Sequence, residues 1–92
     1  MKLMKAFTHF RFVNSTAIRL VFYDGATLKV IFRSGRGYDY HNVPPEYYQA
    51  LISAQSVGVC FGLHIRDQFP HKKLTHEQVT EFLLDLAQSM SN

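Results

Sequence analysis

Apolar and polar residues alternate along residues 17–23 and again along residues 27–33. Such alternation predicts two β-strands, each with one buried face. A looser alternation along residues 6–12 predicts a further strand ahead of them. The side chains expected on the buried face of the two clear strands are Ile18, Leu20, Phe22, Leu28, Val30 and Phe32.

The Asp24-Gly25 pair between the two clear strands predicts a tight turn. A two-residue turn would put the apolar residues of the two strands on opposite faces, because a shift of one residue turns every side chain over. A three-residue loop at residues 24–26 instead pairs Phe22 with Leu28 and keeps the two apolar sets together. We therefore expect the three-residue loop.

The same rule predicts the position of the third strand. A three-residue loop at residues 34–36 pairs Phe32 with Tyr38 and Val30 with Tyr40. Both tyrosines then join the apolar face of the sheet.

Prolines mark the change from strands to helices. The third strand is expected to end before Pro44, because proline cannot donate a hydrogen bond to a sheet. Pro45 suits the first turn of a helix that runs to about Ala54. Ser56 can cap a second helix that runs to about Asp67.

A third helix is predicted within residues 75–92. Thr75 with Gln78 forms a capping-box pattern at its start. An isolated helix of this length is marginal in water, so its apolar stripe must pack within the chain or against another chain. We favour packing within the chain, because a small domain gains much from a third helix. The stripe consists of Val79, Phe82, Leu83, Leu86 and Met90.

These elements predict an α+β fold, with a three- to four-stranded antiparallel meander sheet followed by two or three helices packed on one face. Residues 1–13 form an N-terminal extension that can add a strand, and residues 14–70 form the main domain. Residues 71–92 hold a basic linker, His71-Lys72-Lys73, and the C-terminal amphipathic helix.

Composition narrows the class of protein. The chain has 92 residues, a length typical of one domain, and no apolar run approaches the roughly 18 residues of a membrane span. The N-terminus carries lysines without an apolar region behind them, so no signal peptide is expected. The lone Cys60 excludes an internal disulfide and a cysteine-rich metal site. We expect a cytoplasmic protein with no membrane segment, metal or cofactor.

Charge is distributed unevenly along the chain. Of ten basic and seven acidic residues, three acidic residues and no lysine or arginine lie in residues 75–92. The remaining ten basic and four acidic residues give residues 1–74 a net charge of +6. A basic body suits an anionic partner such as nucleic acid, whereas the acidic helix can simply have a solvated face.

Several different short motifs lie on either side of a central Tyr38-Asp39-Tyr40. The others, in chain order, are Asn14-Ser15-Thr16-Ala17-Ile18-Arg19, Tyr23-Asp24, Phe32-Arg33-Ser34-Gly35, Val43-Pro44-Pro45, Tyr48, Ser56, Gly58, Phe61 and Ile65-Arg66. Their order and spacing resemble the KTSC domain, a short bacterial module named from the C-terminus of some lysyl-tRNA synthetases. The resemblance implies a fold more than a function, because the family has no established activity and RNA binding is its suspected role.

The expected register places a basic, partly aromatic surface on the sheet face opposite the apolar one. Arg19, Lys29 and His41 belong to this surface, with Arg33 beside them and Arg36 in the adjoining glycine-bearing turn. Such a surface suits a phosphate backbone with occasional base stacking. The alternatives are an ordinary solvated face, or a face covered by the N-terminal segment or a second subunit.

A second basic cluster consists of His64-Ile65-Arg66, near the end of the second helix, and His71-Lys72-Lys73 after it. Within it, Arg66 can meet a phosphate or pair with a carboxylate such as Glu46. The complete set of candidate nucleic-acid-binding residues is Arg19, Lys29, Arg33, Arg36, His41, His64, Arg66, Lys72 and Lys73.

The two tyrosines of the central motif have two interpretations. Aromatic side chains two residues apart on a strand project side by side and can stack on bases. The register favours the other interpretation, in which Tyr38 and Tyr40 belong to the core and their hydroxyls reach its edge.

Catalysis finds little support in the sequence. Cys60 and His64 are neighbours on a helix, but no third group that would orient the histidine is evident, and a cysteine among apolar residues is usually a buried hydrophobe. We therefore expect a small non-catalytic nucleic-acid-binding module, most plausibly for RNA. The alternative is a protein-interaction or oligomerisation module that uses residues 75–92.

Overall fold

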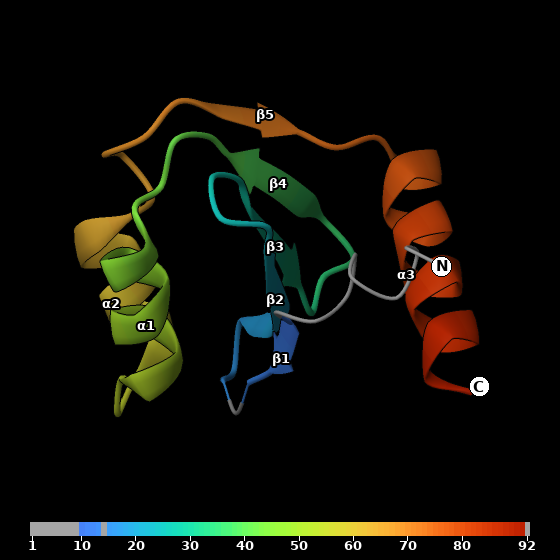
Figure 1. Cartoon of the computed structure of the whole chain (residues 1–92), viewed down its shortest axis with the longest axis horizontal. Coiled ribbons are helices and arrows are strands. Elements are labelled where there is room, and N and C mark those ends of the chain that lie inside the picture. Colours follow the sequence, from blue (N-terminus) through green and yellow to red (C-terminus); the bar gives the residue numbers. More distant parts are fainter. Residues whose placement is uncertain (1–9, 14, 92) are drawn as a thin grey trace.

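The computed structural model describes residues 10–13 and 15–91, and it shows a five-stranded sheet with helices on both faces (Figure 1). The strands are β1 (Phe10–Phe12), β2 (Ile18–Tyr23), β3 (Leu28–Phe32), β4 (Gly37–Tyr40) and β5 (His71–Lys73). The helices are α1 (Pro45–Ser53), α2 (Val57–His64) and α3 (His76–Met90).

The sheet is an antiparallel meander with the strand order β1-β2-β3-β4-β5. The predicted α+β class and meander are confirmed, with more strands than expected. The additional strand is β5, in the segment that the sequence predicts as a basic linker. Its three residues are all exposed and polar, so the sequence has no alternation that would predict a strand. The segment is a strand because it pairs with the edge of β4. At the other edge, β1 covers the last part of the predicted strand 6–12, and residues 6–9 lie outside the described residues.

The hairpin between β2 and β3 differs from the predicted register. Tyr23 pairs with Leu28, and Phe22 therefore faces Lys29. The loop spans the four residues 24–27, and the prediction of a three-residue loop is wrong. The parity of the loop decides which side chains share a face.

Asp24 stabilises this longer loop. Its carboxylate accepts hydrogen bonds from the amides of Ala26 and Thr27, at 2.9 and 2.7 Å. The Asp24 amide also donates to the Thr27 carbonyl at 3.2 Å. An aspartate that bonds the backbone two or three residues ahead is a common way to fix a turn.

Strand β2 is apolar on both faces because both faces are covered. Val21 and Tyr23 belong to the core under α1 and α2, whereas Leu20 belongs to the core under α3. A register shift between Ile18 and Leu20 brings Ile18 to the same side as Val21. The apparent alternation of β2 therefore does not identify one buried face.

The second hairpin keeps the predicted parity. Val30 pairs with Tyr38 and Leu28 with Tyr40, two positions from the predicted partners. The three-residue loop falls at residues 33–35, one position earlier than expected, since the Phe32 amide bonds the Arg36 carbonyl at 2.8 Å. Both tyrosines consequently lie on the predicted face of β4.

Two cores hold the molecule together, one on each side of the sheet (Figure 1). Helices α1 and α2 cover the larger core, and α3 covers the smaller one on the opposite face. The prediction of two or three helices on one face is confirmed by α1 and α2, whereas α3 packs within the chain on the opposite face. The buried residues of the smaller core are Leu20, Ile31, Leu74, Val79 and Leu86.

Each helix begins with the predicted local signal. Pro45 occupies the first turn of α1, and the Ser56 side chain accepts a hydrogen bond from the Val59 amide at the start of α2. Helix α2 ends at His64, one turn before the predicted end. In α3 the capping box is confirmed: the Thr75 hydroxyl accepts a bond from the Gln78 amide, and the Gln78 side chain accepts one from the Thr75 amide.

Gly37 permits the close approach of α3 to the sheet. A Cβ atom at this position would lie 2.9 Å from side-chain atoms of Ile31 and of Val79, and 3.1 Å from one of Leu74. The 2.9 Å contacts are shorter than real Cβ atoms make, so a larger residue would have to displace the Ile31 and Val79 side chains, and glycine permits the close packing of strand and helix.

Candidate nucleic-acid interface

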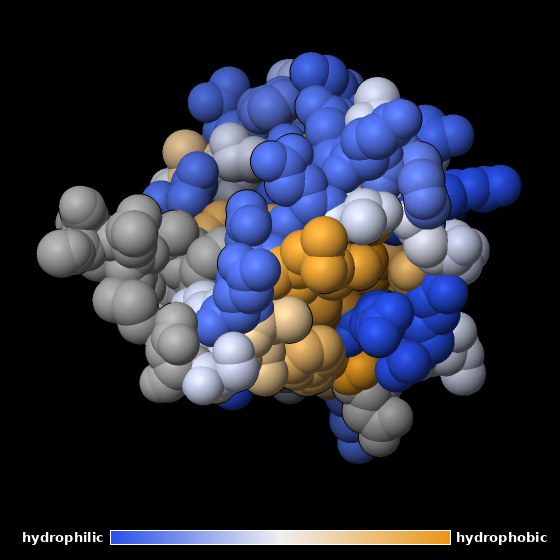
Figure 2. Space-filling view, turned by 90° about the vertical axis from the view of Figure 1, so that its right-hand side faces the viewer, coloured by the Kyte–Doolittle hydropathy of each residue, from blue (hydrophilic) through white to orange (hydrophobic). Residues whose placement is uncertain are grey.

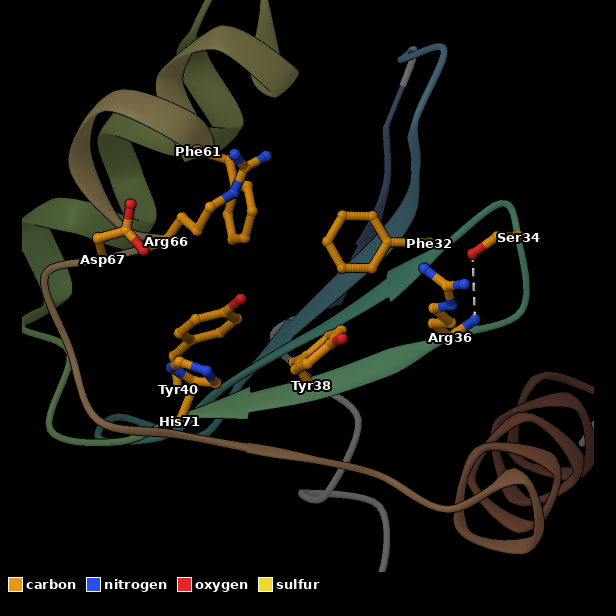
Figure 3. Close-up of a pocket in the computed structure, with 9 residues that line it drawn as sticks. All are labelled: Phe32, Ser34, Arg36, Tyr38, Tyr40, Phe61, Arg66, Asp67 and His71. Carbon is orange, nitrogen blue, oxygen red and sulfur yellow. Dashed lines mark hydrogen bonds between the residues drawn. The ribbon is translucent and has the colours of Figure 1, made fainter.

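A cleft of about 390 Å³ opens on the sheet face that carries α1 and α2 (Figure 3). Its floor is formed by strands β3, β4 and β5, its wall by the end of α2, and its far rim by the β3–β4 hairpin. The lining residues are Phe32, Ser34, Arg36, Tyr38, Tyr40, Phe61, Arg66, Asp67 and His71.

Aromatic rings form the inner surface of this cleft. Tyr38 makes edge contacts with Phe32 and with His71, each with ring centroids 6.0 Å apart. Tyr40 contacts Phe61 at 5.4 Å and His71 at 5.3 Å. These edge-to-face and tilted contacts hold the rings in fixed orientations.

The two tyrosines of β4 differ in exposure. Tyr40 is buried, with 3% of its surface exposed, whereas Tyr38 is partly buried and lines the open part of the cleft. Tyr40 therefore occupies the predicted core position, whereas a ligand can reach the ring of Tyr38.

The Tyr40 hydroxyl keeps its proton at physiological pH. Burial, together with the smaller effects of Tyr38 and Asp67 and against the opposing effect of Arg66, raises the pKa of Tyr40 to about 12. The group is therefore a neutral hydroxyl that can donate or accept a hydrogen bond inside the cleft.

Two guanidinium groups stand at opposite ends of the cleft (Figure 3). Arg66 follows α2 and lies over the Phe61 ring at 5.7 Å, a cation–π contact that positions its side chain. Arg36 comes from the β3–β4 hairpin, where its amide donates to the Ser34 hydroxyl at 3.4 Å. Asp67 is the one carboxylate that lines the cleft, so the cations outnumber the anion there.

Arg66 does not form the ion pair with Glu46 that the sequence left open. Among the described residues, the recorded ion pair joins Lys29 to Asp39 at 2.9 Å. The Arg66 side chain is exposed beside the aromatic rings.

The predicted basic sheet face is not an open surface. Helix α3 packs on this face over Leu20 and Ile31, and Lys29 both pairs with Asp39 and lies 5.3 Å from the centre of the Phe82 ring. The expectation of an uncovered basic face is wrong, because α3 covers this face and the four-residue loop also puts Leu20 on it.

The remaining basic residues of β2 and its neighbours are dispersed. Arg19 is exposed and lines a groove beside the end of α3. Arg33 donates to the Ser15 carbonyl at 2.6 Å and to the Val13 carbonyl at 3.4 Å, which ties the β3–β4 loop to the segment before β2.

The histidines and lysines of the second basic cluster, and His41 of the predicted basic sheet face, also lie apart from one another. His64 is exposed at the end of α2, and the His41 amide bonds the Pro70 carbonyl after β4. On β5, Lys73 pairs with Tyr38 and Lys72 pairs with Asp39. Neither lysine lines the cleft, and Lys73 lines a groove beside the start of α3.

The sequence analysis proposed Arg36 and Arg66 as candidates for binding nucleic acid but did not predict the cleft that both residues line. Phe61 and Arg66 were both part of the family motif, and their spacing around the end of a helix was a usable signal. His71 reaches the cleft only because β5 pairs with β4, and no pattern in the sequence indicates that strand.

Burial raises the pKa of the Cys60 thiol, which disfavours the thiolate that a nucleophile needs. Cys60 packs against the larger core. Within residues 10–13 and 15–91, no cluster of three or more histidine, cysteine or acidic side chains is arranged to hold a metal ion.

These features define a small α+β domain whose sheet carries an aromatic, basic cleft. The KTSC domain family model matches residues 14–69, more than half of the chain. The structure is similar to the crystal structure of a KTSC domain protein from Yersinia pestis, with 30% sequence identity and a TM-score of 0.69. The match covers 73% of this chain and 97% of the Yersinia chain. The chain therefore belongs to the KTSC domain family. A comparison with curated proteins gave no match.

The part of the chain that the structure describes contains no helix long and apolar enough to cross a membrane.

Proposed function

We propose that the protein is a small non-catalytic module that binds single-stranded nucleic acid, most plausibly RNA, in the aromatic cleft. One observation carries the proposal: a reachable tyrosine ring, Tyr38, lies between two guanidinium groups, Arg36 and Arg66, in a single cleft. Proteins that bind single strands combine aromatic rings, on which bases stack, with cations that hold the phosphates.

The size of the cleft supports a single strand over a duplex. About 390 Å³ lies in the range of pockets for small molecules and suits one unstacked nucleotide. Sequence-specific recognition of RNA mostly targets such single-stranded, splayed-out bases. The suspected role of the family in RNA binding points in the same direction.

The proposal is tested by fluorescence anisotropy with a labelled single-stranded RNA at 50 mM and 200 mM salt. Tyr38→Ala should weaken binding by roughly 5- to 150-fold, the equivalent of about 1–3 kcal/mol for one stacked base. Arg66→Gln should weaken binding and reduce the dependence of log affinity on log salt by about 0.7. A matched control is Arg19→Gln, which removes an exposed arginine on the α3 side.

Two results would contradict the proposal. One is the absence of RNA binding by the unaltered protein at 50 mM salt. The other is an equal loss of affinity in Arg66→Gln and Arg19→Gln, since an effect of net charge alone would not depend on the cleft.

A second candidate function is self-association through α3, and an apolar surface favours it. Figure 2 shows an apolar patch on the α3 side of the molecule, and a groove of about 440 Å³ lies between β2 and the end of α3. Phe12, Leu84 and Met90 are each more than half exposed there or nearby. Exposed apolar patches of this kind often mark protein contacts.

A second copy of the chain fits this surface by charge. Helix α3 carries Glu77 and Glu81 in its first half, and Arg19 lies beside its end. An antiparallel pair of α3 helices would bring Arg19 of each copy next to the acidic half of the other helix.

Light scattering after gel filtration tests this candidate. The unaltered protein should show the mass of a dimer at high concentration, and Leu84→Glu should return it to a monomer. Leu63→Glu is the control, because Leu63 is equally apolar and 66% exposed on α2. A monomer at all concentrations would exclude self-association.

A further inference from the structure

A second groove of about 430 Å³ lies on the far side of the β3–β4 hairpin from the cleft. In Figure 3 the hairpin that carries Ser34 and Arg36 lies at the right-hand end of the aromatic cleft, on the same side of the view as α3. Both residues line both cavities. The hairpin is therefore a shared rim, and a chain-like ligand that leaves one cavity across this rim enters the other.

The chemistry of the second groove suits a nucleotide. Arg36, Lys73 and His76 contribute basic side chains at its edge. Its apolar lining comes from Leu74, Val79 and Leu83. Cationic edges with an apolar floor fit a phosphate attached to a flat base.

The charge of this groove comes from side chains and not from the end of α3. The Thr75 and Gln78 side chains already occupy amides at the helix start through the capping box. Lys73 is placed by the sheet: it pairs with Tyr38 across the β4–β5 ladder, and it lines the second groove but not the cleft.

We infer that the two cavities form a continuous track for at least two successive nucleotides of one strand. The inference rests on the proposed function and extends it. The first base stacks on Tyr38 in the cleft, and Arg36 on the shared rim holds the phosphate that links the two nucleotides. Lys73 holds the next phosphate along the strand, at the second groove.

The track predicts that affinity depends on the length of the ligand. Uridine 5′-monophosphate can use the cleft alone, whereas tetrauridylate can cross the rim and use both cavities. One additional charged contact in a hydrogen bond contributes about 1.5–3 kcal/mol, so tetrauridylate should bind at least tenfold more tightly.

Calorimetric titrations of the Lys73→Gln variant distinguish binding in the second groove from binding in the cleft. The substitution should weaken tetrauridylate binding roughly tenfold and lower its salt slope by about 0.7, and leave binding of the monophosphate unchanged. Lys72→Gln is the matched control, because Lys72 is the adjacent exposed lysine of β5 and lines neither cavity. Tyr38→Ala should weaken both ligands.

Each outcome has a distinct meaning. Equal affinity of the two ligands, or equal effects of Lys73→Gln and Lys72→Gln, overturns the track while a Tyr38-dependent loss still supports binding in the cleft. If the unaltered protein binds neither ligand at 50 mM salt, the proposed function and the track both fail.

Discussion

Tyr38 and Tyr40 are two residues apart on β4 and point to the same side of the sheet, yet their surroundings differ. Tyr40 is 3% exposed and contacts Phe61, whereas Tyr38 is partly exposed in the cleft. Tyr40→Ala should lower the free energy of unfolding by about 3–5 kcal/mol, as for a buried aromatic side chain. Tyr38→Ala should lower it by only about 1–2 kcal/mol. Urea titration followed by circular dichroism measures both, and equal losses would contradict this division of roles.

The raised pKa of Tyr40 links stability to pH at the residue scale. The folded state holds this proton more tightly than the unfolded chain, whose tyrosine pKa is about 10. The contribution of the Tyr40 proton to the free energy of unfolding is therefore complete below pH 10, and it is lost as the pH rises towards the folded-state pKa of about 12. Stability should fall by about 1 kcal/mol per pH unit in that window.

Tyr40→Phe isolates this effect. The variant should unfold in urea with a midpoint that falls less steeply between pH 9 and pH 11 than that of the unaltered protein. Burial also raises the pKa of Tyr23 and Tyr48, so some decline should remain. Identical pH profiles would show that Tyr40 ionises equally easily in the folded and unfolded chain.

At the scale of the elements, two glycines have opposite roles. Gly62 lies inside α2, where an added Cβ would meet no atom within 4 Å. Gly62→Ala should raise the free energy of unfolding by about 0.5–1 kcal/mol, because alanine is the better helix former. Gly37→Ala should lower it by about 1–3 kcal/mol through overpacking against Ile31 and Val79. Thermal unfolding compares the two, and a stabilised Gly37→Ala would disprove the close packing of α3 on β4.

Local patterns predicted the three helices and strands β2 to β4, but not strand β5 or the register between β2 and β3. The caps at Ser56 and Thr75 and the proline start of α1 are local signals, and each helix begins where they indicate. The β2–β3 register depends instead on which face of β2 is buried. Both faces are covered, so alternation carried no decisive information, and the four-residue loop closed by Asp24 set the parity.

The candidate site was predictable only in pieces. The sequence indicated Arg36 and Arg66 as candidate phosphate-binding residues, and Tyr38 as either a base-stacking or a core residue. Their convergence depends on β4 pairing with β3 and on α2 packing above it, which are contacts distant in sequence. His71 is brought in by an edge strand with three exposed polar residues, for which propensity and alternation give no signal.

At the scale of the whole molecule, the sheet is stable only if both faces are covered. Leu86 is 2% exposed in the smaller core, whereas Leu84, two residues earlier on α3, is 58% exposed. Leu86→Ala should lower the free energy of unfolding by about 2–5 kcal/mol, the usual effect of a cavity in a core. Leu84→Ala should change it by less than about 0.5 kcal/mol, because the side chain is already in water.

Both variants retain the full chain, so the comparison isolates the docking of α3. Urea unfolding should be done at low protein concentration, where self-association contributes little to stability. Loss of Leu86 leaves Leu20 and Ile31 facing a cavity on the sheet, and the cleft on the other face keeps its residues. Leu86→Ala should therefore weaken stability without changing RNA affinity at temperatures well below its melting point. Equal stability of the two variants would mean that α3 does not cover the sheet.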